Sequence, residues 1–192
     1  NETFKYVKVA MSGEGSDELF GGYNIYREPL ENKAYDMIPL PIRRLIGKIA
    51  GKFPKKRGFN FLVRRSKTLQ DRYVGNAFIF DEKEKDHLLK KRNGVNPLDV
   101  TKPYWNRTKG KDTVTQMQYL DINVWMVHDI LLKADKMSMA NSLEVRVPFL
   151  DKEVFRVASR IPRQYKVDGT VTKRAFRETA HEVLPDKVAE SH

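Results

Sequence analysis

Three acidic residues and two glycines crowd one tight turn near the start of the chain, in the stretch VAMSGEGSDELFGG at Val9–Gly22. Backbone N–H groups in a glycine turn that links a strand to a helix converge on one point and favour an anion such as phosphate. Glu14 and Asp17 would repel a bare phosphate, so a divalent cation such as Mg²⁺ is the natural mediator. The turn therefore suggests a site for a magnesium-bound phosphate ligand.

The standard phosphate-binding signatures are absent from this turn. No Gly-Lys-Ser/Thr follows it, as a P-loop requires, and Glu18 stands where the dinucleotide fingerprint has its third glycine. A purely structural alternative is a helix cap, in which Ser16 or Asp17 caps the next helix and Glu18 complements its dipole. Composition alone favours the helix cap over the ligand site.

The composition is that of a soluble globular protein. The 192 residues are 40% apolar and 32% charged, enough for one domain with a real core. No apolar run approaches the roughly 20 residues that span a bilayer, and no signal-peptide pattern is visible. Cysteine is absent, which excludes disulfides and thiolate metal sites. We predict a cytoplasmic protein that does not bind membranes.

The net charge of +11 raises the possibility of a basic helical nucleic-acid-binding module. The basic clusters at residues 54–58, 64–67 and 88–92 are short and separated, however, and no zinc-finger or RNP-like pattern appears. Basic side chains spread over solvated helix faces explain the charge better, and attraction to anionic substrates such as nucleotides is an intermediate reading. We expect no specific nucleic-acid partner.

The remaining pattern is one strand followed by helices. Alternation and the content of Val and Tyr predict a strand over residues 4–12. Residues 145–150 and 165–171 suggest short extended links. Apolar spacing and capping residues predict helices over residues 40–53, 81–92, 113–127, 129–141, 151–160 and 172–185. The helices at 113–127 and 129–141 are expected to be long and buried.

A lone strand leaves its backbone N–H and C=O groups without partners. The strand at 4–12 therefore suggests neighbours outside this sequence, in a sheet that lies upstream in a longer protein. A short edge hairpin formed within the chain is the less favoured alternative.

Three stretches resemble the asparagine synthetase family of the glutamine-hydrolysing type. They are SGEGSDELFGGY at Ser12–Tyr23, LLKADKMSMANSLEVRVPFLD at Leu131–Asp151 and TKRAFRETAHEVLPDKV at Thr172–Val188. The stretches occur in family order and are specific in combination. No motif marks the middle of the chain, at about residues 31–110.

The resemblance implies that residues 1–192 are the C-terminal part of a synthetase domain. The expected fold is mainly α, the helical portion of an α/β adenine-nucleotide α-hydrolase-like (PP-loop) domain, with one residual strand of its parallel sheet at the N-terminus. The family's glutaminase domain begins with a cysteine, and its pyrophosphate loop reads Ser-Gly-Gly-x-Asp-Ser; neither occurs here. The expectation is a fragment that is inactive alone.

The family's reaction implies the substrates and cofactors. The synthetase domain activates aspartate with ATP and Mg²⁺ as β-aspartyl-AMP, and ammonia released from glutamine then gives asparagine. A homodimer is possible. Related amidotransferases and β-lactam synthetases reuse this domain, but β-lactam-forming relatives have a tyrosine where Glu14 stands, which favours asparagine synthetase.

The resemblance also implies roles for residues of the opening turn. Ser12 and Gly13 would approach the AMP moiety, and Gly15 would let the backbone come close to the ligand. Glu14 would lie by the acyl-adenylate and the incoming ammonia, where a carboxylate can accept a proton or hold ammonium. Asp17 would bind Mg²⁺.

The family's lysine of the third motif corresponds to Lys173. The resemblance implies that it neutralises phosphate charge as pyrophosphate leaves, and Arg177, one helical turn on, could assist it. A cation near a helix N-terminus is electrostatically misplaced, which by itself invites a functional explanation. The structural alternative is a solvated lysine.

Other residues carry weaker expectations. Asp135 and Arg146 could pair with each other, as a structural ion pair or at the substrate. Met126, Met137 and Met139 suggest core packing, and so does Tyr104-Trp105, with a substrate wall as the alternative. The histidines lack metal-ligand spacing and are expected to be non-catalytic: His87, His128, His181 and His192.

Overall fold

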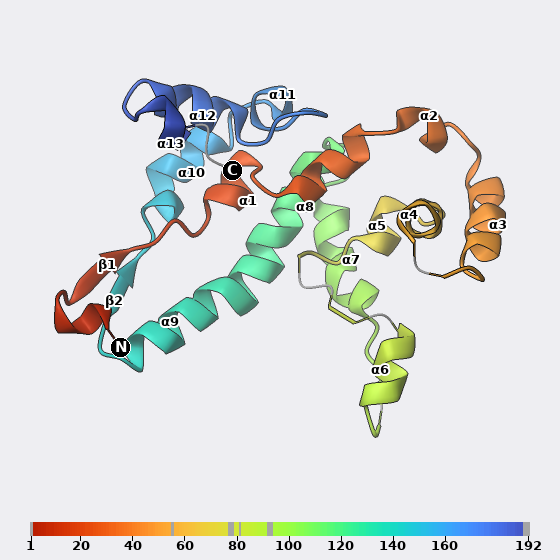
Figure 1. The fold of residues 1–192 in the computed structure, drawn as a ribbon, viewed down its shortest axis with the longest axis horizontal. Helices are drawn as coiled ribbons and strands as arrows, with labels where there is room; N and C mark the ends of the chain where they lie inside the picture. The colour runs from red at the N-terminus through yellow and green to blue at the C-terminus, as the bar shows by residue number, and fades with distance from the viewer. Residues whose placement is uncertain (1, 55, 77–78, 81, 92–93, 190–192) are drawn as a thin grey trace. The chain divides into compact units, whose positions relative to one another are not determined.

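A computed structural model gives the fold of residues 2–54, 56–76, 79–80, 82–91 and 94–189. The chain is mainly helical, as predicted, with two short strands (Figure 1). The α-helices are α1 (Ser16–Phe20), α2 (Lys33–Asp36), α3 (Leu40–Ala50), α4 (Arg57–Arg65), α5 (Leu69–Arg72), α6 (Glu82–Leu88), α7 (Pro97–Arg107), α8 (Thr113–Leu120), α9 (Leu131–Met139), α10 (Lys152–Ala158), α11 (Arg163–Lys166), α12 (Arg174–His181) and α13 (Asp186–Ala189).

The described ranges also contain two strands and several shorter helical segments. They are the strands β1 (Val9–Met11) and β2 (Glu144–Arg146), the 3₁₀ segments η1 (Thr3–Lys5), η2 (Asn24–Leu30) and η4 (Pro148–Leu150), and the π-helical segment η3 (Asp121–Ile130). The chain forms two compact units: residues 1–30 with 110–192, and residues 31–109. The second unit is the stretch in which the sequence offered no motif.

The strand prediction was wrong in two respects. The strand begins at Val9 rather than near residue 4, because Thr3–Lys5 forms a 3₁₀ turn. It also has a partner within the chain: β1 pairs in parallel with β2, with Ala10 opposite Val145. The partner lies in the predicted extended link, and neither a hairpin nor an isolated strand is formed. Parallel pairing needs a long crossover, here the helices between the strands.

One long helical run replaces the two helices predicted over 113–127 and 129–141. It passes from α8 through η3 into α9 without a break at His128 (Figure 1). In η3 the hydrogen bonds lengthen to i→i+5, as shown by the Leu131 N–H, which donates to the Met126 carbonyl. Such π-helical turns are rare and concentrate at functional sites. The prediction that both helices are buried holds for α8 only, since α9 has no buried residue.

The other predicted helices exist with shorter bounds. The helix predicted over 40–53 is α3, with Pro41 in its first turn, and it ends at Ala50. The helix predicted over 151–160 is α10, and Asp151 caps it by accepting from the Glu153 N–H. The helix predicted over 172–185 is α12, which ends at His181 before α13 begins. Of the predicted helix 81–92, α6 is observed, while Asp81 and Arg92 lie outside the described residues.

The core of the first unit forms where α8 packs against η2. Tyr26, Val114, Met117 and Leu120 are completely buried. Three phenylalanines from α1, η4 and α12 pack together, with ring centroids 5.2 Å apart for Phe20 and Phe176 and 5.5 Å apart for Phe149 and Phe176. This cluster ties the first, second and third sequence motifs together.

The methionine prediction was only partly right. Met126 is buried, but Met137 is 62% exposed and Met139 58% exposed. Both lie on α9, on which Leu132 is also exposed. Trp105 is buried against Tyr73 at 6.4 Å, which confirms the core prediction for it.

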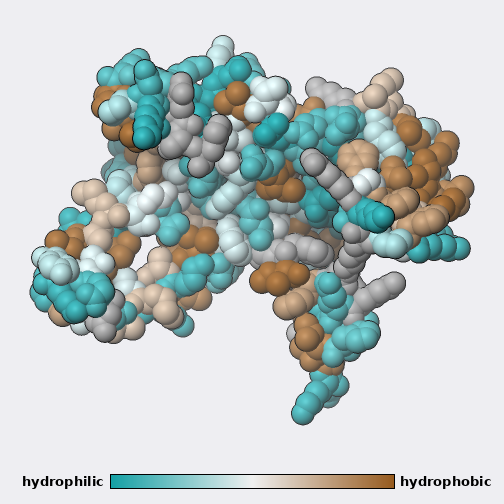
Figure 2. Space-filling model, viewed as in Figure 1, coloured by the Kyte–Doolittle hydropathy of each residue, from teal (hydrophilic) through white to brown (hydrophobic). Residues whose placement is uncertain are grey.

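The second unit is organised around α3 and α4, which pack against each other. Gly47 allows the close approach, because a Cβ there would lie 2.3 Å from the Ser66 Cβ. Arg65, only 1% exposed, binds Asp36 at 2.5 Å and the Glu31 carbonyl at 2.8 Å. The opposite side of α3 exposes apolar side chains, visible as brown surface at the right of Figure 2: Ile42, Leu45 and Ile49.

No helix within the described ranges combines the length and the apolar content that crossing a bilayer requires.

Candidate active site

The acidic turn becomes a single helical turn bounded by glycines. Gly15 precedes α1 with φ +91° and Gly21 follows it with φ +77°, both in the left-handed region that glycine tolerates. A Cβ on Gly15 would lie 2.3 Å from Leu150 Cδ2, so this glycine is also needed for packing. The glycines therefore set where α1 starts and stops.

The capping part of the structural alternative is wrong, although Asp17 and Glu18 do lie in the first turn of α1, where acids complement the helix dipole. The capping position belongs to Gly15, and no side chain caps the helix. Ser16 and Asp17 are already helical, and their side chains point to a lysine from the far end of the chain. Glu18 is 2% exposed and accepts from the Tyr23 hydroxyl at 2.7 Å. The acids of the turn thus make contacts other than capping.

That lysine is Lys173, the residue singled out in the third motif. Its Nζ lies 2.9 Å from Asp17 Oδ1 and donates to Ser16 Oγ at 3.0 Å. The ammonium also lies 6.0 Å from the centroid of the Phe176 ring. The structure therefore brings the first and third motifs together at an ion pair in which the lysine side chain is 20% exposed and the aspartate side chain 38% exposed.

The backbone at Lys173 is unusual. Lys173 is the residue before α12 and has φ +53°, in the left-handed region that non-glycine residues rarely adopt. A tight turn precedes Lys173 in the chain. In this turn Asp168 Oδ1 accepts hydrogen bonds from the N–H groups of Thr170 and Val171 at 2.7 and 2.8 Å. Strained residues of this kind cluster at functional sites.

The same turn perturbs a carboxyl group. The N–H groups of Val171 and Thr170, and then the Thr170 hydroxyl, lower the pKa of Asp168 to about 2. A lowered pKa means that the folded protein stabilises the ionised carboxylate of Asp168 relative to the protonated form. Its stabilising contribution is therefore present above pH 3.8 and is lost as the pH falls toward 2.

Gly22 makes room for the ion pair. A Cβ on Gly22 would lie 1.7 Å from Asp17 Oδ1 and 2.2 Å from Lys173 Cε. We expect Gly22→Ala to displace both side chains and to destabilise the fold by about 1–3 kcal/mol, the usual cost of overpacking. Thermal unfolding measures the loss.

The matched control is Gly169→Ala, because a Cβ there meets nothing within 4 Å. Equal melting temperatures for the two variants would show that the close approach at Gly22 is not needed.

A hollow of about 310 Å³ opens beside the ion pair. Asp17, Lys173 and Arg177 line its polar side. The Arg177 guanidinium donates to the carbonyls of Thr172 at 3.1 Å and Ala189 at 3.4 Å, which fixes it at the rim. The apolar side consists of Phe176, Ala180, Leu184, Val188 and Ala189. Two cations and one carboxylate in a concave site suit a phosphate ligand with a bound cation.

The other predicted site residues lie on the β1 side of α1, outside this hollow. The Ser12 N–H donates to the Arg146 carbonyl at 2.9 Å, which continues the β1–β2 pairing. Gly13 is exposed, and a Cβ there would meet nothing within 4 Å. Glu14 is half-buried, and its carboxylate has no hydrogen-bond or ion-pair partner among the described residues.

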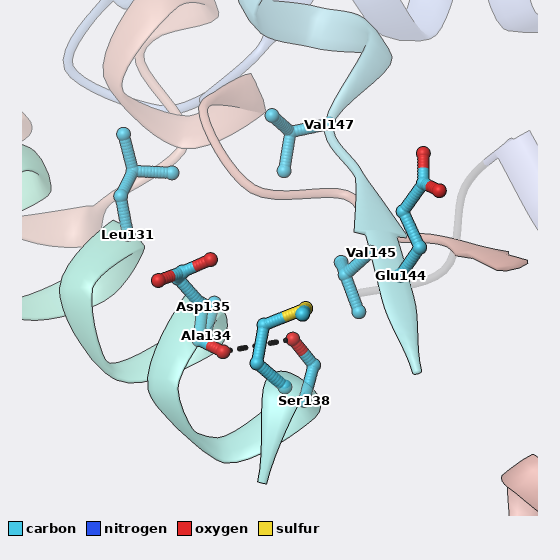
Figure 3. Close-up of a pocket in the computed structure, with 8 residues that line it drawn as sticks. Leu131, Ala134, Asp135, Ser138, Glu144, Val145 and Val147 are labelled. Carbon is cyan, nitrogen blue, oxygen red and sulfur yellow. Dashed lines mark hydrogen bonds between the residues drawn. The ribbon is translucent and has the colours of Figure 1, made fainter. Parts of the chain in front are cut away.

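The sequence suggested that Asp135 and Arg146 could pair with each other, but they do not. Arg146 Nε binds Glu144 Oε1 at 2.8 Å. Asp135 instead lines a second hollow, of about 230 Å³, between α9 and β2. Figure 3 shows α9 and β2 on the two sides of this hollow, with Val145 of β2 pointing toward α9 and Ser138 Oγ donating to the Asp135 carbonyl at 3.1 Å.

A buried polar network under α1 was not anticipated. Gln118 Nε2 donates to the carbonyls of Glu18 at 2.7 Å and Leu19 at 3.3 Å, and the Tyr26 hydroxyl donates to Asp121 Oδ2 at 2.6 Å. Burial raises the pKa of Glu18, and it also raises the pKa of Tyr23 above its usual value. Polar residues inside the apolar pattern of the predicted helix 113–127 were the available signal.

No cluster of three or more histidines or acids that could hold a metal ion occurs in the part of the chain that the structure describes. Mg²⁺ commonly takes only one or two protein carboxylates and completes its shell with water and phosphate oxygens. Asp17, in the hollow with two cations, fits such a partial donor set. His192 lies outside the described residues.

Comparison with known proteins identifies the family. Residues 2–192 match the asparagine synthase family. The chain belongs to the asparagine synthase family. It is 51% identical over 189 residues to asparagine synthetase [glutamine-hydrolyzing] 1 of Bacillus subtilis, covering 97% of this chain and 30% of that protein.

Other asparagine synthase relatives are similar. The chain is 48% identical to a putative asparagine synthetase [glutamine-hydrolyzing] of Mycobacterium tuberculosis, over 97% of this chain and 29% of that protein. It is 26% identical to amidase chyE of Penicillium rubens, over 90% of this chain and 28% of that protein. The chain thus spans about 30% of the length of these relatives. No solved structure matches it.

Proposed function

We propose that this chain is the C-terminal part of the PP-loop synthetase domain of a glutamine-hydrolysing asparagine synthetase in the cytoplasm. Its substrates would be aspartate, ATP and glutamine-derived ammonia. The observation that carries the proposal is the convergence of Asp17 and Lys173, which come from opposite ends of the chain, at 2.9 Å beside a concave site. Helix ends packed for stability alone do not require a strained lysine in the left-handed region.

The charges of the hollow match the needs of adenylation. In the acyl-adenylate step the aspartate carboxylate attacks the α-phosphorus of ATP, and the bond to the leaving pyrophosphate breaks. Lys173 and Arg177 would neutralise the oxygens of that leaving group, on which negative charge develops. Mg²⁺, held through Asp17, would supply further charge neutralisation.

The other residues of the first motif would serve the nucleotide and the second step. Ser12 and Gly13, at the end of β1, would approach the AMP moiety, with Gly15 keeping the backbone close. Glu14 has no partner among the described residues, which leaves its carboxylate available to a ligand. It would hold the incoming ammonia or accept its proton as the nitrogen attacks the acyl carbon and AMP leaves.

A different acceptor is the second candidate. A relative named as an amidase is similar over 90% of this chain, and related amidotransferases reuse this domain. Glu14 supports asparagine synthetase over a β-lactam-forming relative, because such relatives have a tyrosine at this position.

The test uses the full-length protein that carries this chain, supplied with ATP, Mg²⁺ and ammonium. Aspartate should support ATP–pyrophosphate exchange and give asparagine, whereas other carboxylic acids should support neither. Exchange that needs another acid would favour the second candidate. Exchange with no acid would refute the synthetase reaction.

Glu14→Ala separates the two chemical steps. We expect this variant to keep most of the ATP–pyrophosphate exchange. Its rate of asparagine formation should fall by about 10²-fold, the lower end of the roughly 10²–10⁴-fold contribution that a general base makes. The measurement compares exchange with asparagine output at saturating ammonium.

Glu144→Ala is the control, because this glutamate is exposed and pairs only locally with Arg146. If Glu14→Ala and Glu144→Ala behave alike, Glu14 takes no part in the second step.

A further inference from the structure

The five-residue helix α1 is too short to be stable alone, because an isolated helix below about 12 residues is marginal in water. Its last carbonyls also lack partners within the helix. The N–H groups of Gly21 and Gly22 both donate to the Asp17 carbonyl, at 2.9 and 2.8 Å. Among the other carbonyls, those of Glu18 and Leu19 belong to residues that are only 2% and 3% exposed, so water has little access to them.

One side chain satisfies both carbonyls. Gln118 on α8 is 4% exposed, and its Nε2 donates to the Glu18 carbonyl at 2.7 Å and the Leu19 carbonyl at 3.3 Å. Asp121, one turn further along the same helical run, accepts from Tyr26. The helical run of α8 and η3 therefore forms hydrogen bonds both with α1 and with η2, the segment that follows α1.

The two carbonyls that Gln118 binds lie directly next to the candidate site along the chain. Asp17, which meets Lys173, directly precedes Glu18, whose carbonyl accepts the shorter of the two Gln118 bonds. A rotation of so short a helix moves all its side chains together. Whatever fixes the carbonyls therefore also fixes the direction of the Asp17 carboxylate.

We propose that Gln118 is a positioning residue that holds α1 in register, so that Asp17 and Ser16 face Lys173. This inference rests on the proposed role of Asp17 in holding Mg²⁺. Gln118 does not line the hollow and would act through the two carbonyls.

The test is Gln118→Met in the full-length protein, because methionine keeps the length of glutamine and lacks the donor. Leaving the two carbonyls unsatisfied should lower the hydrogen-exchange protection of the peptide Ser16–Gly22 on the order of tenfold. The half-saturating Mg²⁺ concentration for ATP–pyrophosphate exchange should rise several-fold, because Asp17 holds its binding position for a smaller fraction of the time.

Val114→Ala is the matched control. Val114 is completely buried one turn earlier on α8 and makes no hydrogen bond to α1 through its side chain. This variant should lower the melting temperature but leave both the protection of Ser16–Gly22 and the Mg²⁺ dependence at wild-type values. A merely structural role for Gln118 would make the two variants indistinguishable.

The outcomes separate this inference from the function on which it rests. Unchanged protection in Gln118→Met overturns the positioning role. So does reduced protection with unchanged Mg²⁺ dependence, provided that Asp17→Asn does alter that dependence. If Asp17→Asn leaves the Mg²⁺ dependence unchanged, the metal role of Asp17 is what fails, and the positioning of a metal ligand by Gln118 is refuted with it.

Discussion

Lys173→Met should lower the turnover rate of aspartate-dependent ATP–pyrophosphate exchange by roughly 10²-fold or more in the full-length protein. Methionine is nearly isosteric with lysine and removes only the charge. The ammonium lies 2.9 Å from Asp17 and lines the hollow together with Arg177. A cation that neutralises a leaving group acts mainly in the transition state, so the loss should fall on kcat rather than on KM for ATP.

Arg174→Met is the control for this substitution. Arg174 is the next residue, but its guanidinium pairs with Asp168 at 2.6 Å instead of Asp17. This variant should lose some stability and keep the exchange rate. Exchange at the wild-type rate in Lys173→Met would show that the ion pair with Asp17 only braces the two helix ends.

Asp17→Asn should reduce ATP–pyrophosphate exchange by roughly 10²-fold at limiting Mg²⁺, with part of the loss recovered as Mg²⁺ is raised. Asparagine keeps the size of the side chain and removes its charge, which weakens binding of a cation that prefers carboxylate oxygens. Glutamine hydrolysis in the same preparations should be unaffected. A titration of exchange rate against Mg²⁺ makes the measurement.

Asp36→Asn tests whether loss of an ion pair alone gives the same result. Asp36 binds the buried Arg65 at 2.5 Å and Arg43 at 2.9 Å in the second unit. Removing the charge of Asp36 should cost several kcal/mol of stability, since the buried Arg65 loses this carboxylate, but it should leave the Mg²⁺ titration unchanged. Identical titrations for Asp17→Asn and wild type would contradict a metal role for Asp17.

The sequence by itself determined the helical character of the chain and the residues worth testing. Apolar spacing and a first-turn proline such as Pro41 act within a few residues, so they can be interpreted without knowing the fold. The glycines around α1 belong to the same class, because the left-handed conformation at Gly15 and Gly21 is a local requirement. The three motifs, in their order along the chain, indicated the family that the comparison then showed.

Only the tertiary structure decided which of these residues meet. Asp17 and Lys173 are separated by nearly the whole chain, and no local pattern states that they form an ion pair. The pairing of β1 with β2 and the hydrogen bond from Gln118 to the Glu18 carbonyl of α1 likewise join residues far apart in the sequence. Hydrophobicity alone placed Met137 in the core, yet α9 leaves it exposed. Such contacts depend on how whole elements pack, and tertiary packing overrides what a short window of sequence prefers.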